Sequence, residues 1–482
     1  MKENIDVNLA MESLQKARKM AKQCPLRPKY HFLAPAYWMN DPHGLIYYNG
    51  EYHIFYQHNP YGEEWGTIHW GHAKSKDLVY WEHLPIALVP SRKHNEENCY
   101  SGSCILNNEI PTIIYTSIGP DKPQTTGAEQ WLALSTDNMI SWQKYEKNPI
   151  MTLKLHASEN LDIKEWRDPY IWKENDKYYA ILAGYIYKPH MPVILLYSSP
   201  NLIDWEFIKI LTKGNFKGRI KWECPNFFTL KDKQILIVSS FKNQIYAKEV
   251  YAIDRHVYYT IGVYKNTNFE YYDWNILDHG SLFYAPSTMI DPKGRVILWG
   301  WLSAVGTMGW NGCLTLPRIL TLRPDNKLGF KPAPELMILR KKHFKFKKLS
   351  INESLNDSLK EIQVNCLEIL VKFKLNDDDL ISIKFNEIDE SQSIIYYQKS
   401  NQMRIGKERF DFALLSDEKF LELHIFLDNS IIEVFINNRA CYSGQLFSQM
   451  DKPLSINLIS NNKNTNIESL DIWSLNSIWK KK

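Results

Sequence analysis

The chain has 482 residues, of which 44% are hydrophobic and 23% charged, and its formal net charge is +4. This composition excludes a disordered chain, and the small, dispersed charge argues against nucleic acid or a membrane surface as a partner. A chain of this length exceeds what one hydrophobic core usually holds, so we expect two domains.

Residues 1–29 form the first predicted segment. Within residues 6–23, small apolar side chains recur on one face at helical spacing, namely Ala10, Leu14, Ala17 and Ala21. We therefore expect a short helix that packs against the rest of the protein. The segment lacks an apolar core of signal-peptide length, no stretch reaches transmembrane length, and the seven cysteines show no paired spacing. These features predict reduced thiols and a cytoplasmic location.

A carboxylate stands at the start of the first predicted sheet. Residues 38–60 read WMNDPHGLIYYNGEYHIFYQHNP, and Asp41 lies between Asn40 and Pro42, where the backbone bends. Two short aromatic runs follow, joined by an Asn-Gly step that is a strong hairpin signal. A lone Asp beside Pro most often only caps a turn, so other carboxylates must join Asp41 before catalysis is credible.

Similar segments recur at intervals of roughly 60 residues. Four of them end in tryptophan, at Trp81, Trp142, Trp205 and Trp274. Short polar motifs lie upstream at a similar spacing: Asn40-Asp41-Pro42, Ser101-Gly102-Ser103, Arg167-Asp168-Pro169, Glu223-Cys224-Pro225 and Tyr284-Ala285-Pro286. This repetition in strand-rich sequence predicts a β-propeller of five blades over residues 30–325, in which the motifs converge on one channel.

Two more carboxylates, Asp168 and Glu223, occupy equivalent points of this repeat. On an extended strand Arg167 would point away from Asp168, so only Asp168 is expected to face the channel. Glu223, surrounded by aromatic residues, is suited to proton donation, and the alternative is a structural salt bridge with Arg167 or Lys221. His69 and His72 would lie on opposite faces of a strand, so we expect structural histidines and no metal site.

The second domain is expected to follow a proline-containing linker, residues 326–342, and to span residues 343–482. Alternating strands are predicted there, among them residues 367–373, 391–397, 421–426 and 431–436. Residues 352–358 are poor in apolar side chains, which predicts an exposed loop. Glu433 lies within an apolar strand, where we expect a structural role.

Seven motifs occur in order along the chain: WMNDPHG, FYQHNP, YSGS, WRDPY, WECP, GSLFYAPS and GWNGCLTLPR. Together they resemble glycoside hydrolase family 32, which contains invertases, sucrose-6-phosphate hydrolases and fructanases. The resemblance extends from Tyr30 to the end of the chain, because FLDNSIIEVFIN at residues 426–437 is similar to a strand of that family's C-terminal domain. It implies an all-β fold, a five-bladed β-propeller followed by a C-terminal β-sandwich.

The resemblance also implies roles for individual residues. Asp41 would be the nucleophile, Glu223 the general acid/base and Asp168 the stabiliser of the transition state. The fructose pocket would be lined by Asn40, Gln57, Trp65, Ser101 and Arg167. Cleavage of a fructosyl bond through an oxocarbenium-like state needs such a set of carboxylates and no metal or organic cofactor.

The resemblance therefore predicts a retaining glycosidase that releases terminal β-D-fructofuranosyl residues from sucrose or sucrose 6-phosphate. The alternatives are a fructo-oligosaccharide or fructan hydrolase, a fructosyltransferase of the same fold, and a carbohydrate-binding propeller without turnover. The expected partner is a small sugar, and the sequence leaves homo-oligomerisation open. Candidates for contacting a phosphate include Arg92, Lys93 and Lys221.

The chain departs from the family pattern at two positions beside the acids. His43 stands where members usually carry Asn, and Asn226 where they commonly carry Asp. Neither residue is one of the three acids, so hydrolysis remains the prediction. Both could alter the pH profile or the leaving-group preference, and the sequence does not decide between these effects.

Overall fold

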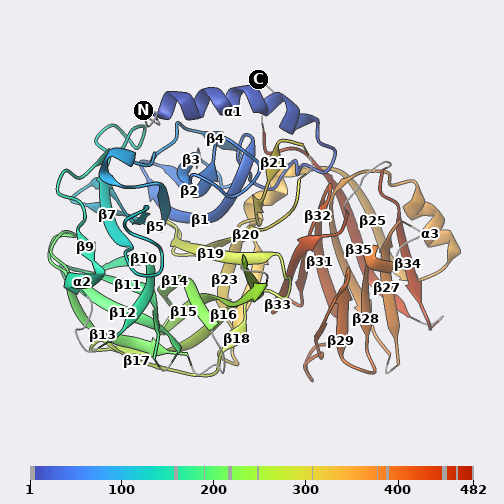
Figure 1. Cartoon of the computed structure of the whole chain (residues 1–482). Coiled ribbons are helices and arrows are strands. Elements are labelled where there is room, and N and C mark those ends of the chain that lie inside the picture. The colour runs from blue at the N-terminus through green and yellow to red at the C-terminus, as the bar shows by residue number, and fades with distance from the viewer. Residues whose placement is uncertain are drawn as a thin grey trace.

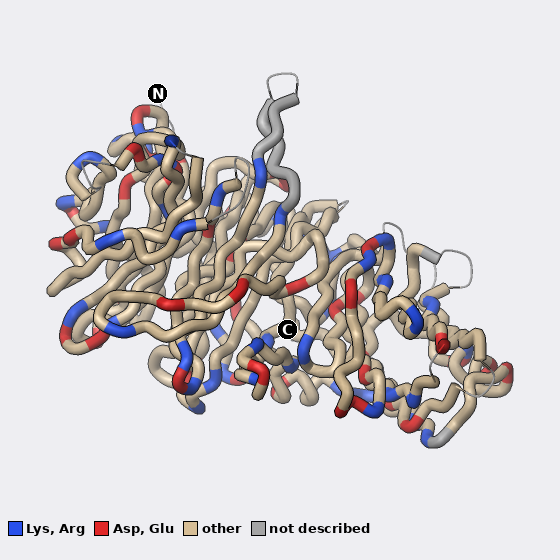
Figure 2. The backbone as a smooth tube through the Cα atoms, turned by 90° about the horizontal axis from the view of Figure 1, so that it is seen from below, with Lys and Arg blue, Asp and Glu red and all other residues tan. Residues whose placement is uncertain are grey.

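The computed structural model describes residues 6–156, 161–188, 190–214, 220–246, 249–306, 308–376, 378–386, 390–447, 453–462 and 465–479. The chain forms two adjacent β-rich parts, a ring of small sheets and a layered pair of sheets, with helix α1 (Val7–Gln23) lying along one edge of the ring (Figure 1). Lys and Arg are interspersed with Asp and Glu over both parts (Figure 2), as the small net charge predicts.

Five antiparallel sheets make up the ring, as the sequence repeat predicts, each with its strands ordered outward from the centre. The first three sheets contain β1 (Tyr37–Tyr48), β2 (Glu51–Asn59), β3 (His69–Ser75) and β4 (Trp81–His83); β5 (Asn98–Asn107), β6 (Ile110–Ile118), β7 (Glu129–Leu134), β8 (Gln143–Lys144) and β9 (Met151–Thr152); and β10 (Ile163–Glu174), β11 (Lys177–Ile186), β12 (Met191–Ser199) and β13 (Glu206–Lys213). The other two contain β14 (Ile220–Leu230), β15 (Lys233–Tyr246), β16 (Glu249–Lys265), β17 (Asn268–Tyr271) and β18 (Asn275–Ile276); and β19 (Phe283–Ile290), β20 (Val296–Leu302), β22 (Cys313–Leu314), β23 (Arg318–Leu322) and β24 (Leu328–Pro332).

The ring is closed by a short segment of the last repeat. Strand β21 (Trp310–Asn311) pairs in parallel with β1 of the first sheet. The Asn-Gly step between β1 and β2 forms the predicted two-residue hairpin, with positive φ at both Asn49 (47°) and Gly50 (81°). Helix α1 buries the four residues that its periodicity predicted, Ala10, Leu14, Ala17 and Ala21.

The second part is a sandwich of two sheets. One contains β25 (Arg340–Ser350), β35 (Asn466–Leu475), β26 (Cys366–Lys374), β31 (Leu421–Asp428), β32 (Ile431–Ile436) and β33 (Ala440–Gln445). The other contains β30 (Glu408–Asp411), β29 (Gln402–Ile405), β28 (Ser393–Tyr397), β27 (Leu380–Phe385) and β34 (Ile456–Ser460). A separate hydrophobic core lies between these sheets, as expected for sandwich packing. Short helices complete the chain: α2 (Leu153–His156), α3 (Glu353–Lys360), η1 (Arg92–His94), η2 (Pro334–Leu339) and η3 (Glu390–Gln392).

Two local expectations are wrong. Residues 326–342 are regular structure and not a hinge, because β24 pairs with β23 in the fifth sheet and buries Leu328 and Phe330, after which η2 leads directly into β25. The predicted loop at residues 352–358 is mostly helix α3. The side chain of Asn352 accepts a hydrogen bond from the backbone N–H of Leu355 and caps this helix.

The two parts are joined by buried charged groups. Arg318 on β23 contacts Asp278 (2.7 Å) and Glu433 of β32 (2.8 Å), and all three side chains are buried. His31 lies between Asp428 (2.9 Å) and Glu433 (3.1 Å). Glu433 therefore has the structural role that its apolar strand suggested.

Candidate active site

The five polar motifs coincide with breaks in the inner strands. In every blade the register shifts at the motif, between a residue of the motif and one just outside it: Met39 and Pro42, Cys99 and Gly102, Arg167 and Tyr170, Glu223 and Asn226, Tyr284 and Ser287. Such bulges re-aim side chains. At three of them the backbone is left-handed, at Asp168 (φ 60°), Cys224 (φ 47°) and Ala285 (φ 45°).

The bulge in β10 corrects one expectation. Arg167 and Asp168 do not point in opposite directions, since both line the same cavity and the Arg167 Nε lies 3.9 Å from the Asp168 carboxylate. The alternation of an extended strand fails here because Asp168 has a left-handed backbone.

A cavity of about 730 Å³ gathers the predicted residues. Its lining includes all three acids, Asp41, Asp168 and Glu223, together with Asn40, Gln57, Trp65 and Arg167. Trp65 is half exposed, which suits a residue at the cavity mouth. Ser101 is not part of this lining, although its hydroxyl contacts Asp41. It lines instead a second cavity of about 300 Å³, together with His43.

Asp41 is held by four donors. Its Oδ1 accepts a hydrogen bond from the Asn40 amide (3.1 Å), and its Oδ2 accepts hydrogen bonds from the Ser101 hydroxyl (2.8 Å), the Gln57 amide (3.3 Å) and the Cys224 thiol (3.3 Å). Burial raises the pKa of Asp41 above its usual value, and the hydrogen bond from Ser101 opposes that shift. These contacts fix the orientation of the carboxylate.

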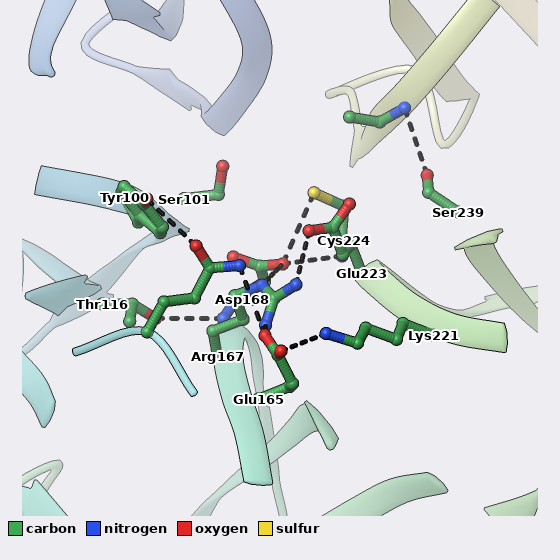
Figure 3. Close-up of polar contacts among 12 residues, drawn as sticks. Tyr100, Ser101, Thr116, Glu165, Arg167, Asp168, Lys221, Glu223, Cys224 and Ser239 are labelled. Carbon is green, nitrogen blue, oxygen red and sulfur yellow. Dashed lines mark hydrogen bonds and ion pairs between the residues drawn. The ribbon is translucent and has the colours of Figure 1, made fainter. Parts of the chain in front are cut away.

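Glu223 is tied to a cation and a phenol. Arg167 Nη2 donates to its Oε1 at 2.5 Å, and the Tyr284 hydroxyl donates to its Oε2 at 2.8 Å. Arg167 is in turn held by Glu165 (2.6 Å), which also pairs with Lys221. Figure 3 shows Arg167 between the two glutamates. Of the two predicted salt bridges of Glu223, the one with Arg167 exists, while the partner of Lys221 is Glu165.

Asp168 is buried beside Arg167. The backbone N–H of Cys224 donates to its carboxylate (3.0 Å), and its own N–H donates to the Thr116 hydroxyl (3.0 Å). Burial raises the pKa of Asp168 to about 7, although the charge of Arg167 acts in the opposite direction.

Several residues of the site were missed in the sequence. Tyr284 occupies the fifth position of the polar repeat, so its place in the channel could have been found there. Glu165 directly precedes the WRDPY motif, and no local signal marks it, because its role depends on the positions of Arg167 and Lys221. Arg255 on β16 also lines the cavity. Its segment belongs to none of the motifs.

The three candidate phosphate contacts do not lie in one cavity. Arg92 and Lys93 line a different cavity of about 830 Å³, beside Trp131 and Trp142. Lys221 lines the site but is paired with Glu165.

Within the part of the chain that the structure describes, no group of three or more His, Cys, Asp or Glu residues could hold a metal ion. Over those same residues, no helix has the length and apolarity needed to cross a membrane.

Comparisons with known proteins agree with this geometry. The model of the glycosyl hydrolases family 32 N-terminal domain matches residues 31–332, and the model of the family 32 C terminal matches residues 335–474. A sucrose-6-phosphate hydrolase of Zymomonas mobilis is 32% identical over 466 residues, covering 89% of this chain and 87% of the relative. A raffinose invertase of Escherichia coli is 30% identical over 481 residues, covering 92% of this chain and 94% of the relative.

Solved structures share the fold over the full length. A Bombyx mori GH32 beta-fructofuranosidase superposes with a TM-score of 0.81 at 25% identity, covering 99% of this chain and 100% of that one. A sucrose-6-phosphate hydrolase from Lactobacillus gasseri superposes with a TM-score of 0.78 at 22% identity, covering 98% and 100%. With two family models that together span most of its length, the chain belongs to glycoside hydrolase family 32.

Proposed function

We propose that the protein is a retaining β-fructofuranosidase that releases fructose from sucrose or sucrose 6-phosphate. The observation that carries this proposal is the gathering of Asp41, Asp168 and Glu223 on one cavity, with Arg167 and Tyr284 bound to Glu223. The names of the relatives agree with these substrates, since they include sucrose-6-phosphate hydrolases and a raffinose invertase.

The proposed reaction is a double displacement. A carboxylate oxygen of Asp41 attacks the anomeric carbon of the fructosyl unit while Glu223 gives a proton to the departing glycosidic oxygen. The resulting fructosyl ester is opened by a water molecule whose proton returns to Glu223, and Asp41 leaves as a carboxylate. Two inversions at the same carbon retain its configuration.

Asp168 and the amides around Asp41 have supporting roles in this proposal. The ionised form of Asp168 accepts hydrogen bonds from sugar hydroxyls, and these bonds strengthen as positive charge develops on the ring. Asn40 and Gln57 hold the nucleophile in one orientation, so little reorganisation is needed when it attacks. Ser101, which lines the 300 Å³ cavity, donates a hydrogen bond to the same carboxylate.

A cytosolic location forms part of the proposal. None of the seven cysteines, which all lie in the described part of the chain, forms a disulfide, and Cys99, Cys313 and Cys441 are buried. A chain without disulfides suits a reducing compartment. Sucrose or its 6-phosphate is small enough to be imported, whereas a polymeric fructan is not.

A steady-state comparison tests the proposed function. Sucrose, sucrose 6-phosphate and a short inulin-type oligosaccharide are offered to the wild type, to Asp41→Ala, and to Asp232→Ala, which removes an exposed carboxylate as a control. We expect fructose release by the wild type and the control, and a loss of at least about a thousandfold in kcat for Asp41→Ala. NMR of the first fructose anomer released checks retention, and added acceptor sugars reveal any transfer.

The outcomes separate the alternatives. If the oligosaccharide has the highest kcat/KM, the protein is a fructan hydrolase, and if transfer products dominate, it is a fructosyltransferase. Binding of a sugar without turnover by the wild type would overturn the enzymatic proposal in favour of a binding propeller.

A further inference from the structure

His43 lies close to the nucleophile Asp41 and is linked to it through Ser101. His43 follows Asp41 by two residues on β1 and is buried. Its ring stacks on Trp70 of β3, with centroids 3.8 Å apart, and its Nδ1 lies 3.3 Å from the hydroxyl of Ser101. Its Nε2 has no hydrogen-bond partner among the described residues, and His43 is one of the residues that line the 300 Å³ cavity. In the described structure, His43 is therefore linked to the nucleophile Asp41 through Ser101.

The contacts of Asn40 determine the direction of the hydrogen bonds that lead through Gln57 to Ser101. The indole N–H of Trp38 donates to the Asn40 Oδ1 (2.8 Å), which assigns the amide nitrogen of Asn40 to the other side. That nitrogen donates to the Gln57 Oε1 (2.8 Å). The amide nitrogen of Gln57 must then face Ser101, where it donates to the hydroxyl oxygen at 2.6 Å.

The hydroxyl of Ser101 has one proton and two lone pairs. Its proton goes to the Asp41 carboxylate, which is closer (2.8 Å) than His43 and which, when ionised, can only accept hydrogen bonds. Gln57 occupies one lone pair. The remaining lone pair can be used only by a donor, so His43 must present Nδ1–H, and its Nε2 is a bare acceptor with no partner among the described residues.

We propose that His43, as the neutral Nδ1–H tautomer, is a positioning residue that donates to Ser101 and thereby strengthens the hydrogen bond from Ser101 to the nucleophile Asp41. A hydroxyl that accepts two hydrogen bonds is a stronger donor, because each bond polarises the next. Burial holds the pKa of His43 well below its usual value, so the ring stays neutral over the working pH range. The proposal rests on the proposed function, in which Asp41 attacks as a carboxylate.

Loss of the donor from His43 is expected to weaken the stabilisation of ionised Asp41. The acid limb of the pH profile of kcat/KM should then move to higher pH. The other titratable groups near Asp41 are Glu223 and Cys224 of β14 and Asp168 and Arg167 of β10, and none of them contacts His43 in the described structure. A shift on changing His43 therefore reports on the path through Ser101.

Three variants test the proposal. His43→Phe keeps a ring that can stack on Trp70 but removes both nitrogens, whereas His43→Asn keeps an N–H donor at a similar distance from the backbone. We expect His43→Phe to lower kcat about three- to tenfold, the rate equivalent of one hydrogen bond, with little change in KM and with the acid limb moved upward. His43→Asn should restore most of the rate and return the acid limb toward the wild-type position. His43→Leu replaces the Phe variant if thermal melting shows that Phe is not accommodated.

A double-mutant cycle with Ser101→Ala checks the path. In that background His43→Phe should cost less than about twofold, since there is no hydroxyl left to polarise. Full additivity of the two changes, an unmoved acid limb in His43→Phe, or equal losses in the Phe and Asn variants would each overturn the proposal.

Nitrogen NMR of histidine-labelled protein provides a readout that does not depend on turnover. The His43 signals, identified by their absence in His43→Asn, should show a protonated Nδ1 and a bare Nε2. The opposite tautomer overturns the proposal even if the enzyme is active. If the wild type cleaves none of the sugars but the tautomer is as expected, it is the proposed function that has failed.

Discussion

At the scale of single residues, three cations line the cavity, and Arg255 is the one without an ion pair to any described side chain. Its guanidinium lies over the rings of Tyr284 (5.7 Å) and Trp301 (5.8 Å) and donates to the Ser303 hydroxyl at 3.4 Å. It forms no ion pair with any side chain that the structure describes, in contrast to Arg167 and Lys221. An unpaired guanidinium beside the sugar cavity is suited to an anionic group on the leaving sugar.

Arg255→Gln should therefore change substrate preference. We expect the ratio of kcat/KM for sucrose 6-phosphate to that for sucrose to fall about ten- to hundredfold, the worth of a hydrogen bond to a charged group. Lys93→Gln, at the separate cavity, is the matched control and should leave the ratio within about twofold. An unchanged ratio in Arg255→Gln would exclude Arg255 from phosphate recognition.

At the scale of elements, the bulged inner strands place the acids, and β5 shows how tightly such a strand is packed. A Cβ atom on Gly102 would lie 2.1 Å from the carbonyl oxygen of Ile114 and 2.6 Å from the Cα of Tyr115, both in the backbone of β6. Backbone atoms cannot move aside as a flexible side chain can, so only glycine allows this approach. The position of Ser101, one residue earlier, depends on it.

Gly102→Ala is expected to damage both stability and rate. Overpacking should lower the free energy of unfolding by about 1–3 kcal/mol, and the displaced Ser101 should lower kcat about tenfold. Urea denaturation and steady-state kinetics measure the two effects. Gly62→Ala is the control, because its Cβ would meet only the Asn59 amide at 3.7 Å. Similar behaviour of the two variants would show that the close approach of β5 to β6 does not position Ser101.

At the scale of the whole molecule, the propeller and the sandwich are joined by His31 and its two carboxylate partners, Asp428 and Glu433. Burial alone would lower the pKa of His31, but hydrogen bonds to these two groups raise it to about 9. A raised pKa in the folded state means that the folded protein holds this proton more tightly than the unfolded chain does. The stabilisation is complete below about pH 6.5 and is lost as the pH rises through about 9.

His31→Gln should reveal this dependence. The difference in unfolding free energy between wild type and variant is expected to be largest near pH 6 and to shrink by about 3 kcal/mol toward pH 10. Chemical denaturation across this range measures it. His343→Gln, which breaks an exposed pair with Asp471, serves as the control and should change little at any pH. A difference for His31→Gln that does not vary with pH would contradict an imidazolium at the interface.

The architecture and the convergence of three carboxylates on one cavity could be predicted from the sequence, because their signals are local and repeated. The tryptophan-ended segments and polar motifs indicated five blades, and the Asn-Gly step and the face of α1 followed from short-range rules. Helix α3 does not follow from the composition of its segment, which is poor in apolar side chains, although Asn352 is a normal capping residue.

The sequence by itself determined the repeat, the kind of each sheet and the identity of the three carboxylates, since these depend on residue type and spacing along the chain. Only the tertiary structure decided which neighbours the carboxylates have. The left-handed backbone at Asp168 allows Asp168 and Arg167 to line the same cavity, where Arg167 binds Glu223. Tyr284 reaches Glu223 from another blade. Bulges and contacts between blades depend on residues that are distant along the chain, so no local pattern encodes them.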